Sequence, residues 1–492
     1  MTHGAVAAGS PRVVDAGLRA LRLGGGAVDA VIAATLVSCV VEPLLGGLGG
    51  AGLAMVRLGG QARCLDFFTA MPGLGTDAAP PMDEIVVDFG VTRQTFHAGP
   101  GAVAVPGLPA GLAALHAAGG TLPLDVLAEP AIAAAQEGFE VTPVLATVAS
   151  LLTPILGRDP AVAAAFAPTG RPVRAGERFR WPQMGEGIAA FARSGGALWT
   201  GPVGARVLEV LGPRSRLNAE DLGRYRATWA TPLQVAFRDA VITLPGPPSV
   251  AGLLVCRALR ALEPTAAEAP GTAAEVTRLA RAWAEAEAGR ADVTERLFAP
   301  DFVARALAET RNAGFTTHIS AIDGRGDAVS LTHSLGETAG VAVPELGLLL
   351  NSFLGESDVN PPAHPRPPGG RLYTMCCPTL VERGDRVTVL GTGGSSRIRS
   401  AILQGVVNQV DHGLDPGPSV MAPRAHLEQG VLHVEAPGRP AGAVSTLRDQ
   451  HPDLVVFEAP HLFFGGLHTV ASDGDRFLGA GDARRDGAWG RV

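Results

Sequence analysis

Lysine is absent from this chain, so all 40 of its lysine-plus-arginine positions are arginines. This excludes mechanisms that use a lysine Schiff base or a lysine general base. The glycine-rich runs at 46–52 and 391–394 therefore lack the lysine of a phosphate-binding loop, and they lack the partner acid of a dinucleotide site. The net charge is −7, and no basic stretch could follow the phosphates of a nucleic acid. We expect no nucleic-acid partner.

Cysteine is scarce, and its five positions show no spacing typical of a metal site: Cys39, Cys64, Cys256, Cys376 and Cys377. The odd count and the apolar surroundings predict buried, reduced thiols in a reducing compartment. Apolar runs such as 30–41 suit a buried helix but are too short to span a bilayer. The first residues show no basic and apolar signal-peptide pattern. We expect a cytoplasmic protein with no membrane partner, no metal and no cofactor.

Hydrophobic periodicity predicts a mixture of helices and strands. Helices are expected over 15–23, 28–41, 110–118, 130–137, 273–288 and 399–410, and Asn218 is expected to cap a further short helix. Strands are expected over 53–58 and in the region that begins at Thr316. Proline and glycine predict irregular structure at 73–88 and 153–180, and a stiff, lid-like loop at 360–370.

A threonine opens the predicted strand region in a position that matters for chemistry. Thr316, Thr317 and His318 begin an alternating strand, which a turn at 324–326 connects to a second one. If the bond after Phe315 breaks, Thr316 gains a free α-amine with a reference pKa of about 7.7–8.0. That amine can serve as the base for the threonine's own hydroxyl. On these residues alone, an ordinary β-hairpin is the better explanation.

A series of motifs along the whole chain changes that balance, because it resembles the γ-glutamyltransferase family in order and spacing. The motifs are LGGGAVDA at 23–30, VEP at 41–43 followed by GGLGG at 46–50, AVPG at 104–107 with AGL at 110–112, EGF at 137–139, LNAEDL at 217–222, PPS at 247–249 before Gly252, SRI at 396–398, APR at 422–424 and DARRDG at 482–487. Each motif is weak alone, but the ordered set is specific. The sequence TTH at 316–318 falls where that family cleaves itself.

The resemblance implies an α/β (α+β) fold, namely the four-layer αββα sandwich of the N-terminal nucleophile hydrolases. It also implies a zymogen that cleaves itself into a large subunit of residues 1–315 and a small subunit of residues 316–492. These two fragments would remain together as one intertwined domain. The oligomeric state stays open between a single copy and a homodimer.

The resemblance also implies the catalytic residues. Thr316 matches the nucleophile, and Ser334 matches a hydroxyl residue on the next strand that hydrogen-bonds to it. Gly394 and Ser395 match the glycine pair whose backbone forms the oxyanion hole, with Ser395 in place of the second glycine. A backbone N–H donor tolerates that change. His318 is interpreted as a structural histidine, and His333 is expected on the face opposite to Thr332.

The substrate pocket departs from the family. Family members hold the glutamyl carboxylate with an arginine and two serines, and the glutamyl amine with asparagine, glutamine and aspartate. In this chain the arginine position is occupied by Phe68, the two serine positions by Thr374 and Met375, and the asparagine, glutamine and aspartate positions by Gly336, Phe353 and Glu356. We add Thr332 to the predicted substrate residues, because it lies two residues before Ser334 on the same face of the strand. Arg371, Arg397 and Arg424 remain candidates for a carboxylate elsewhere, or for structural roles. Loss of a bidentate arginine should abolish selectivity for glutamate.

The resulting prediction is an autoprocessed threonine hydrolase or acyltransferase that cleaves an amide bond of a small molecule other than a standard γ-glutamyl substrate. Three alternatives remain open. One is ordinary γ-glutamyl transfer or glutathione hydrolysis. Another is hydrolysis of a carbon–carbon bond in a pyrroline intermediate of antibiotic biosynthesis, as in some members of the family. The third is an unprocessed, non-catalytic pseudoenzyme, because the aromatic Phe315 is unusual before the cleavage point.

Overall fold

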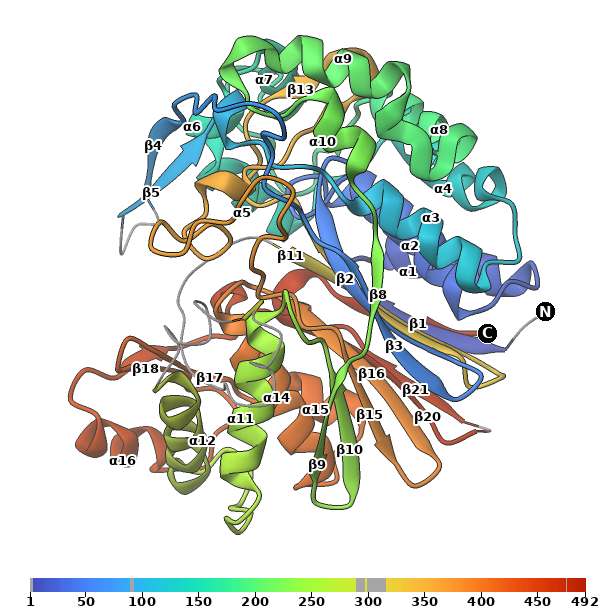
Figure 1. Ribbon diagram of the computed structural model, residues 1–492. Helices are drawn as coiled ribbons and strands as arrows, with labels where there is room; N and C mark the ends of the chain where they lie inside the picture. Colours follow the sequence, from blue (N-terminus) through green and yellow to red (C-terminus); the bar gives the residue numbers. More distant parts are fainter. Residues whose placement is uncertain (1–2, 89–92, 289–296, 299–315, 475) are drawn as a thin grey trace.

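The computed structural model describes residues 3–88, 93–288, 297–298, 316–474 and 476–492, and its centre is formed by two stacked antiparallel sheets (Figure 1). The first sheet has the order β22 (Ala488–Arg491), β1 (Gly4–Ala8), β11 (Thr316–Asp323), β12 (Ala328–Ser334), β2 (Ala51–Leu58), β3 (Gln61–Phe67) and β8 (Thr228–Ala230). The second has the order β21 (Phe477–Ala480), β20 (Gly466–Ser472), β16 (Arg386–Gly393), β15 (Thr379–Arg383), β10 (Ala240–Leu244) and β9 (Leu233–Phe237). Strand β11 packs across the interface against β16 and β20.

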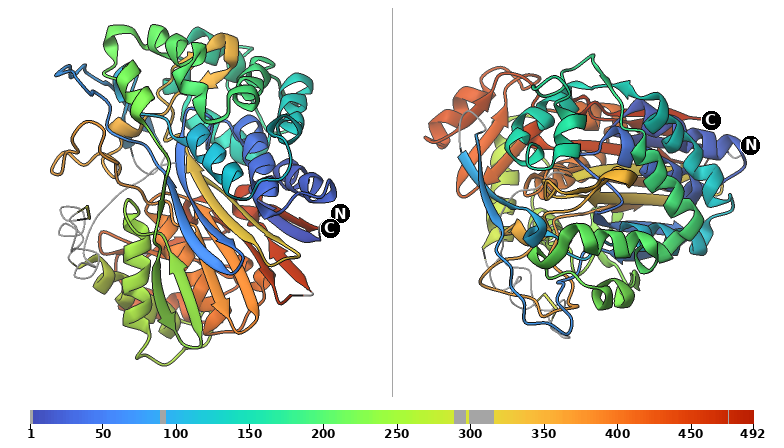
Figure 2. Two further views of the ribbon diagram at one scale, coloured as in Figure 1. Left: turned by 45° about the vertical axis from the view of Figure 1, so that its right-hand side comes forward. Right: turned by 90° about the horizontal axis from the view of Figure 1, so that it is seen from above.

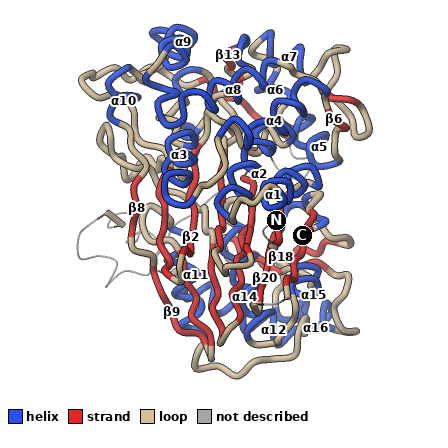
Figure 3. Tube along the Cα trace, turned by 90° about the vertical axis from the view of Figure 1, so that its right-hand side faces the viewer, coloured by secondary structure: helices blue, strands red, loops and turns tan. Residues whose placement is uncertain are grey.

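Helices cover the outer face of each sheet, so the protein has four layers in the order αββα, as predicted (Figures 1 and 3). On the first sheet lie α1 (Pro11–Arg22), α2 (Ala27–Val41) and α3 (Leu108–Gly119), while α4 (Leu124–Glu137) packs on α2 and α8 (Gln183–Ser194) packs on α4. On the second lie α11 (Val250–Leu262), α12 (Ala273–Glu287), α14 (Arg397–Val410) and α15 (Pro416–Met421). The two views of Figure 2 show that strands from both ends of the chain share the sheets. The N-terminal and C-terminal strands β1 and β22 are paired directly.

Smaller elements complete the layers. The helices are α5 (Pro143–Leu151), α6 (Thr153–Leu156), α7 (Pro160–Phe166), α9 (Pro202–Leu211), α10 (Ala219–Arg224) and α16 (Ala443–Gln450). The short strands are β4 (Asp83–Asp88), β5 (Arg93–Ala98), β6 (Phe139–Glu140), β7 (Arg178–Phe179), β13 (Ala342–Val343), β14 (Leu348–Leu349), β17 (Ala425–Glu428), β18 (Val431–Glu435) and β19 (Val455–Phe457).

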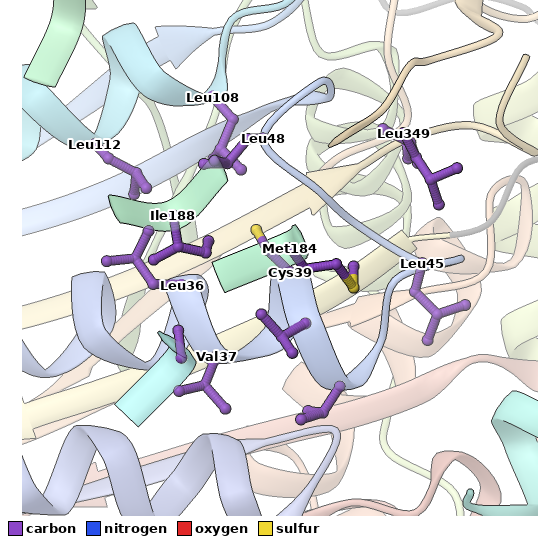
Figure 4. Close-up of a cluster of buried hydrophobic side chains, with 14 of the residues drawn as sticks. Leu36, Val37, Cys39, Leu45, Leu48, Leu108, Leu112, Met184, Ile188 and Leu349 are labelled. Carbon is purple, nitrogen blue, oxygen red and sulfur yellow. The ribbon is translucent and has the colours of Figure 1, made fainter. Parts of the chain in front are cut away.

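Helix α2 lies at the centre of the upper core, and every one of its residues is buried. Figure 4 shows its side chains Leu36, Val37 and Cys39 in the same cluster as Leu112 of α3 and Ile188 of α8. A helix that is apolar on all sides has no face suited to water, so burial between a sheet and other helices is the expected outcome. The prediction of a buried helix over 28–41 is therefore confirmed.

Two segments that were predicted to be irregular contain regular structure. Residues 83–88 form β4, where Ile85 and Val87 are buried on one side and Val86 is exposed on the other. Within 153–180 the chain forms α6, α7 and β7. The side chain of Asp159 caps α7 by accepting hydrogen bonds from the N–H groups of Ala161 and Val162. Proline content concealed these elements, because proline is favourable in the first turn of a helix.

Helix α4 begins earlier than predicted and contains Pro130 in its interior. Proline lacks the N–H that would bond to the carbonyl four residues before it, which is that of Val126. Arg19 supplies the missing donor, since its Nη1 lies 3.1 Å from the Val126 carbonyl oxygen. A residue more than 100 positions away thus permits a helix that local propensity disfavours.

The other general expectations can be compared directly. The predicted cap at Asn218 is confirmed, because its side chain accepts hydrogen bonds from the N–H groups of Glu220 and Asp221. All five cysteines are buried free thiols, as predicted. Residues 360–370 contain no helix or strand, and their action as a lid stays a prediction. In the described part of the chain, we find neither a helix long and apolar enough to cross a membrane nor a metal-binding group of side chains.

Candidate active site

The strand pair β11–β12 brings two of the predicted catalytic residues together. In its register Thr316 lies opposite Ser334, and both side chains are buried. The antiparallel pairing places these residues at the same end of the two strands, beside the turn that follows β16. The preceding segment 310–315, including Phe315, lies outside the described residues.

His318 lies two residues after Thr316 on the same face of β11, and its ring contacts two hydroxyl groups. Its Nδ1 is 2.8 Å from Oγ1 of Thr332, and its Nε2 is 2.9 Å from Oγ of Ser320. Burial holds the pKa of His318 well below its usual range, so the ring is neutral. A Cβ on Gly391 would come within 2.2 Å of the imidazole, which explains why glycine stands there. The arrangement suits a structural histidine between the two sheets.

The predicted substrate residue Thr332 is thus engaged by His318 and does not line the cavity described below. His333 points to the other side of the sheet, as expected from strand alternation. There its Nε2 lies 2.9 Å from Oγ of Ser38 in α2. Burial lowers the pKa of His333 to about 3, so it too is neutral at ordinary pH.

The glycine turn after β16 lies very close to the first residue of β11. A Cβ on Gly393 would lie 1.7 Å from the carbonyl oxygen of Thr316, so only glycine fits at this contact. Gly394 and Ser395 follow with positive φ angles of 124° and 54°, and α14 begins two residues later, at Arg397. The turn therefore presents backbone groups and the N-terminal end of a helix dipole beside Thr316, an arrangement suited to an oxyanion.

Ser395 adopts a left-handed backbone conformation that favours glycine. We expect Ser395→Gly to raise the free energy of unfolding by about 0.5–1 kcal/mol while turnover stays near the wild-type value. The backbone N–H remains in the variant, and the hydrogen bond from Ser395 Oγ to Asp358 Oδ2 is long, at 3.4 Å. Thermal unfolding and turnover should be measured beside Ser395→Ala, which loses the same hydroxyl but keeps the unfavourable φ. Equal losses of turnover in both variants would show that the hydroxyl is needed.

A small cavity of about 20 Å³ brings most of the predicted residues together. This is room for about one water molecule. Eight of the predicted residues line it: Phe68, Thr316, Ser334, Phe353, Glu356, Thr374, Met375 and Ser395. The other lining residues, which were not predicted to be part of the site, are Asp358, Val359, Cys376 and Ile398. Gly394 adjoins the cavity through Ser395 but does not itself line it.

Gly336 lies behind Glu356 rather than at the cavity surface. A Cβ at this position would come within 2.2 Å of Glu356 Oε1 and 2.6 Å of Ser352 Oγ. The φ of Gly336 is also positive, at 67°. Glycine therefore leaves the space that the Glu356 carboxyl occupies.

Two phenylalanines form the apolar wall of the cavity. The rings of Phe68 and Phe353 have centroids 5.2 Å apart and are tilted by 49°, and both side chains are buried. Tilted aromatic pairs of this kind are favourable. Among the described residues that line the cavity there is no arginine or lysine. Phe68 and Phe353 thus give this side of the cavity an apolar surface.

The three arginines considered as alternative carboxylate ligands all have protein partners. Arg371 pairs with Asp66 at 2.8 Å and lines a separate cavity of about 500 Å³. Arg424 pairs with buried Asp482 at 2.8 Å. Arg397 donates from Nε to the Phe463 carbonyl at 3.1 Å. These contacts support structural roles for Arg371 and Arg424 in particular, because their partners are buried acids.

Buried acids give the cavity its polar side. The Glu356 side chain is 9% exposed, and its Oε1 has no hydrogen-bond partner among the described residues. Burial, together with the neighbouring Glu337 and Asp358, holds the pKa of Glu356 well above its usual range. Burial also raises the pKa of Glu337. A protonated Glu356 can donate a hydrogen bond as well as accept one. Glu337 and Asp358 had not been predicted, although Glu337 follows Gly336 directly and Asp358 lies two residues after Glu356.

Two further charged residues that had not been predicted contact the first two residues of β11. Arg485 Nη1 lies 3.3 Å from the carbonyl oxygen of Thr316, and Thr317 donates from Oγ1 to Glu42 Oε2 at 3.0 Å. Both belong to motifs noted in the sequence, VEP at 41–43 and DARRDG at 482–487. These motifs contributed to the resemblance to the family, but they did not indicate that Glu42 and Arg485 would contact residues 316–317.

Known proteins resemble this chain in sequence and in fold. The family model described as gamma-glutamyltranspeptidase matches residues 14–311 and 300–492. The acylase ACY 1 proenzyme of Pseudomonas sp. (strain SE83) is 31% identical over 524 aligned residues, which cover 99% of this chain and 93% of that protein. The glutathione hydrolase proenzyme of Escherichia coli (strain K12) is 28% identical, with 86% and 81% coverage. The crystal structure of a cephalosporin acylase from Bacillus halodurans shares the fold, with a TM-score of 0.83, 24% identity, and 99% and 96% coverage.

Proposed function

Because the chain belongs to the γ-glutamyltranspeptidase family, whose members include acylases and glutathione hydrolases, we propose that it is a self-processing amide hydrolase or acyltransferase with Thr316 as its nucleophile. The observation that carries this proposal is the cavity in which Thr316, Ser334 and Ser395 meet an apolar wall. Cleavage between Phe315 and Thr316 would separate residues 1–315 from residues 316–492. The proenzyme names of the relatives support such a step.

The reaction follows from the groups around Thr316. Its free α-amine takes the hydroxyl proton while Oγ attacks the amide carbonyl, and Ser334 orients the hydroxyl. The backbone N–H groups of Gly394 and Ser395 hold the oxyanion, and one such donor is typically worth about 10²–10³ in rate. The carbon–nitrogen bond then breaks, and the proton passes to the leaving amine. Water or a second amine attacks the acyl-enzyme, releases the acyl group and restores Thr316.

The acyl group of the substrate is apolar and carries no carboxylate close to the reacting carbonyl. Phe68, Phe353 and Met375 supply the apolar wall, while Thr374 and Glu356 supply its polar contacts. A carboxylate buried against this wall would lack a cationic partner. An uncompensated buried charge costs about 3–5 kcal/mol. The Phe68–Phe353 pair thus argues against γ-glutamyl amides, which is the finer part of the proposal.

A matched set of substrates tests this proposal. We expect the value of kcat/KM for an apolar acyl p-nitroanilide, such as hexanoyl or phenylacetyl, to exceed that for γ-glutamyl p-nitroanilide by at least about 100-fold, since 1.4 kcal/mol is a factor of ten. The leaving group is the same, so the ratio reports the acyl pocket alone. Equal or greater turnover of the γ-glutamyl compound would contradict the specificity. If the protein instead cleaved a carbon–carbon bond of a pyrroline substrate and left the amides intact, carbon–carbon hydrolysis would be its reaction.

A further inference from the structure

Glu42 and Arg485 contact the first two residues of β11 from segments at opposite ends of the sequence. Glu42 follows the last residue of α2, and its Oε2 accepts the hydrogen bond from the Thr317 hydroxyl. Arg485 follows β21 and donates from Nη1 to the Thr316 carbonyl oxygen. Glu42 therefore holds the side chain of Thr317, and Arg485 holds the backbone of Thr316.

The surroundings of Glu42 are shaped for a carboxylate at this place. A Cβ on Gly9 would come within 2.2 Å of Glu42 Oε1, so the end of β1 makes room for the acid. A cavity of about 10 Å³ lies beside the acid and is also lined by Ser10, Arg485 and Asp486. This cavity is separate from the acyl pocket, because the two have no lining residue in common.

Arg485 also reaches the turn that follows β16. A Cβ on Gly393 would lie 3.2 Å from Arg485 Nη1, and a Cβ on Gly394 would lie 3.4 Å from its Nη2. Its side chain is 6% exposed, and its Nε has no hydrogen-bond partner among the described residues. A buried guanidinium needs an opposing charge. Arg485 thus links the nucleophile strand to the proposed oxyanion turn.

We propose that Glu42 and Arg485 are positioning residues, a buried clamp of opposite charges that fixes Thr316 and Thr317 against the 393–395 turn when Glu42 is ionised. The clamp rests on the proposed function, because it assumes that Thr316 is the nucleophile. It acts through residues 316 and 317 and does not itself touch the substrate. Its consequence is that both self-cleavage and turnover depend on the charge of Glu42.

The charge of Glu42 is set by the groups that face it. Burial raises its pKa to about 7, against the lowering effect of the Thr317 hydrogen bond; Asp486 raises the pKa and Arg485 lowers it. Cys39, on the same helix, is a protonated thiol, since burial raises its pKa. Above pH 7 Glu42 is ionised, and its negative charge attracts the positive charge of Arg485. Below pH 7 it is protonated, and the clamp loses its negative charge.

Self-cleavage offers the clean test, because the Thr316 nitrogen is still part of a peptide bond at that stage and cannot titrate. The full chain should be made by cell-free synthesis and shifted to buffers between pH 6 and pH 8. The appearance of the fragments is then followed by denaturing mass spectrometry. For the wild type we expect cleavage about tenfold slower at pH 6 than at pH 8, as for an acid with a pKa near 7.

Substitutions at Glu42 and Thr317 test whether Glu42 causes this pH dependence. Glu42→Gln is expected to cleave at least fivefold more slowly than wild type at pH 8, with a rate that no longer changes with pH. Thr317→Val removes the hydroxyl that donates to Glu42 and should slow cleavage at pH 8. Thr317→Ser keeps a hydroxyl and should cleave at close to the wild-type rate. This pair preserves the test if Glu42→Gln folds poorly, and thermal unfolding of each variant monitors the fold.

Two outcomes would overturn the clamp in distinguishable ways. A Glu42→Gln variant with the wild-type rate and pH profile, or a Thr317→Val variant as fast as Thr317→Ser, would exclude the clamp while leaving Thr316 as nucleophile. A wild-type chain that is not cleaved between Phe315 and Thr316 at any pH would instead remove the proposed function on which the clamp rests.

Discussion

Thr316→Ala is expected to remain a single chain of 492 residues under denaturing conditions, whereas the wild type separates into residues 1–315 and 316–492. The alanine variant lacks the hydroxyl that attacks both the preceding peptide bond and the substrate. We expect its turnover to fall by about 10⁴-fold or more, the scale seen when a covalent nucleophile is removed. Denaturing mass spectrometry reports the cleavage, and p-nitroanilide release reports the turnover.

Thr316→Ser is the matched control, because it keeps the hydroxyl and loses only a methyl group. It should be cleaved at the same bond and retain measurable turnover. Intact chains in all three proteins, each folded and without turnover, would favour the pseudoenzyme alternative. Fragments from the alanine variant that meet at the same bond would point to an external protease.

Phe68→Arg is expected to remove most of the preference of the acyl pocket for apolar acyl groups. The new guanidinium would lie in the wall beside Phe353, on the same cavity as the acid Glu356. A bidentate arginine recognises a carboxylate far better than an aromatic ring does. We expect the ratio of kcat/KM for γ-glutamyl to hexanoyl p-nitroanilide to rise by about 100-fold, which corresponds to about 2.7 kcal/mol. Initial rates with the two substrates give this ratio directly.

Phe68→Leu separates charge from volume in this experiment. Leucine keeps an apolar wall, so turnover of the hexanoyl substrate can change while the ratio moves little. The double variant Phe68→Arg/Phe353→Gln replaces both rings of the pair and should raise the ratio further. An unchanged ratio in Phe68→Arg, in a protein that still folds, would mean that the acyl group does not contact residue 68.

Several features of this protein could be predicted from the order of its residues alone. The segment 28–41, which is apolar on all sides, was predicted to be a buried helix, and it lies within α2. The alternation after Thr316 predicted two strands, and in the structure they pair with Thr316 opposite Ser334, the residue that the resemblance had matched. The ordered motifs predicted the four-layer fold and the family. The resemblance matched Phe68, Phe353 and Met375 to pocket positions and so predicted an apolar wall, and all three line the cavity beside Thr316.

Only the tertiary structure decided how distant segments meet. Nothing near Pro130 indicated that Arg19 would bond to the carbonyl left free in α4. In the same way, the contacts of Glu42 and Arg485 with residues 316–317 arise from the packing of α2 and of the C-terminal segment around β11. Periodicity and turn residues are local properties, so a sequence displays them directly. A contact between residues hundreds of positions apart depends on the packing of the whole core, which no local pattern records.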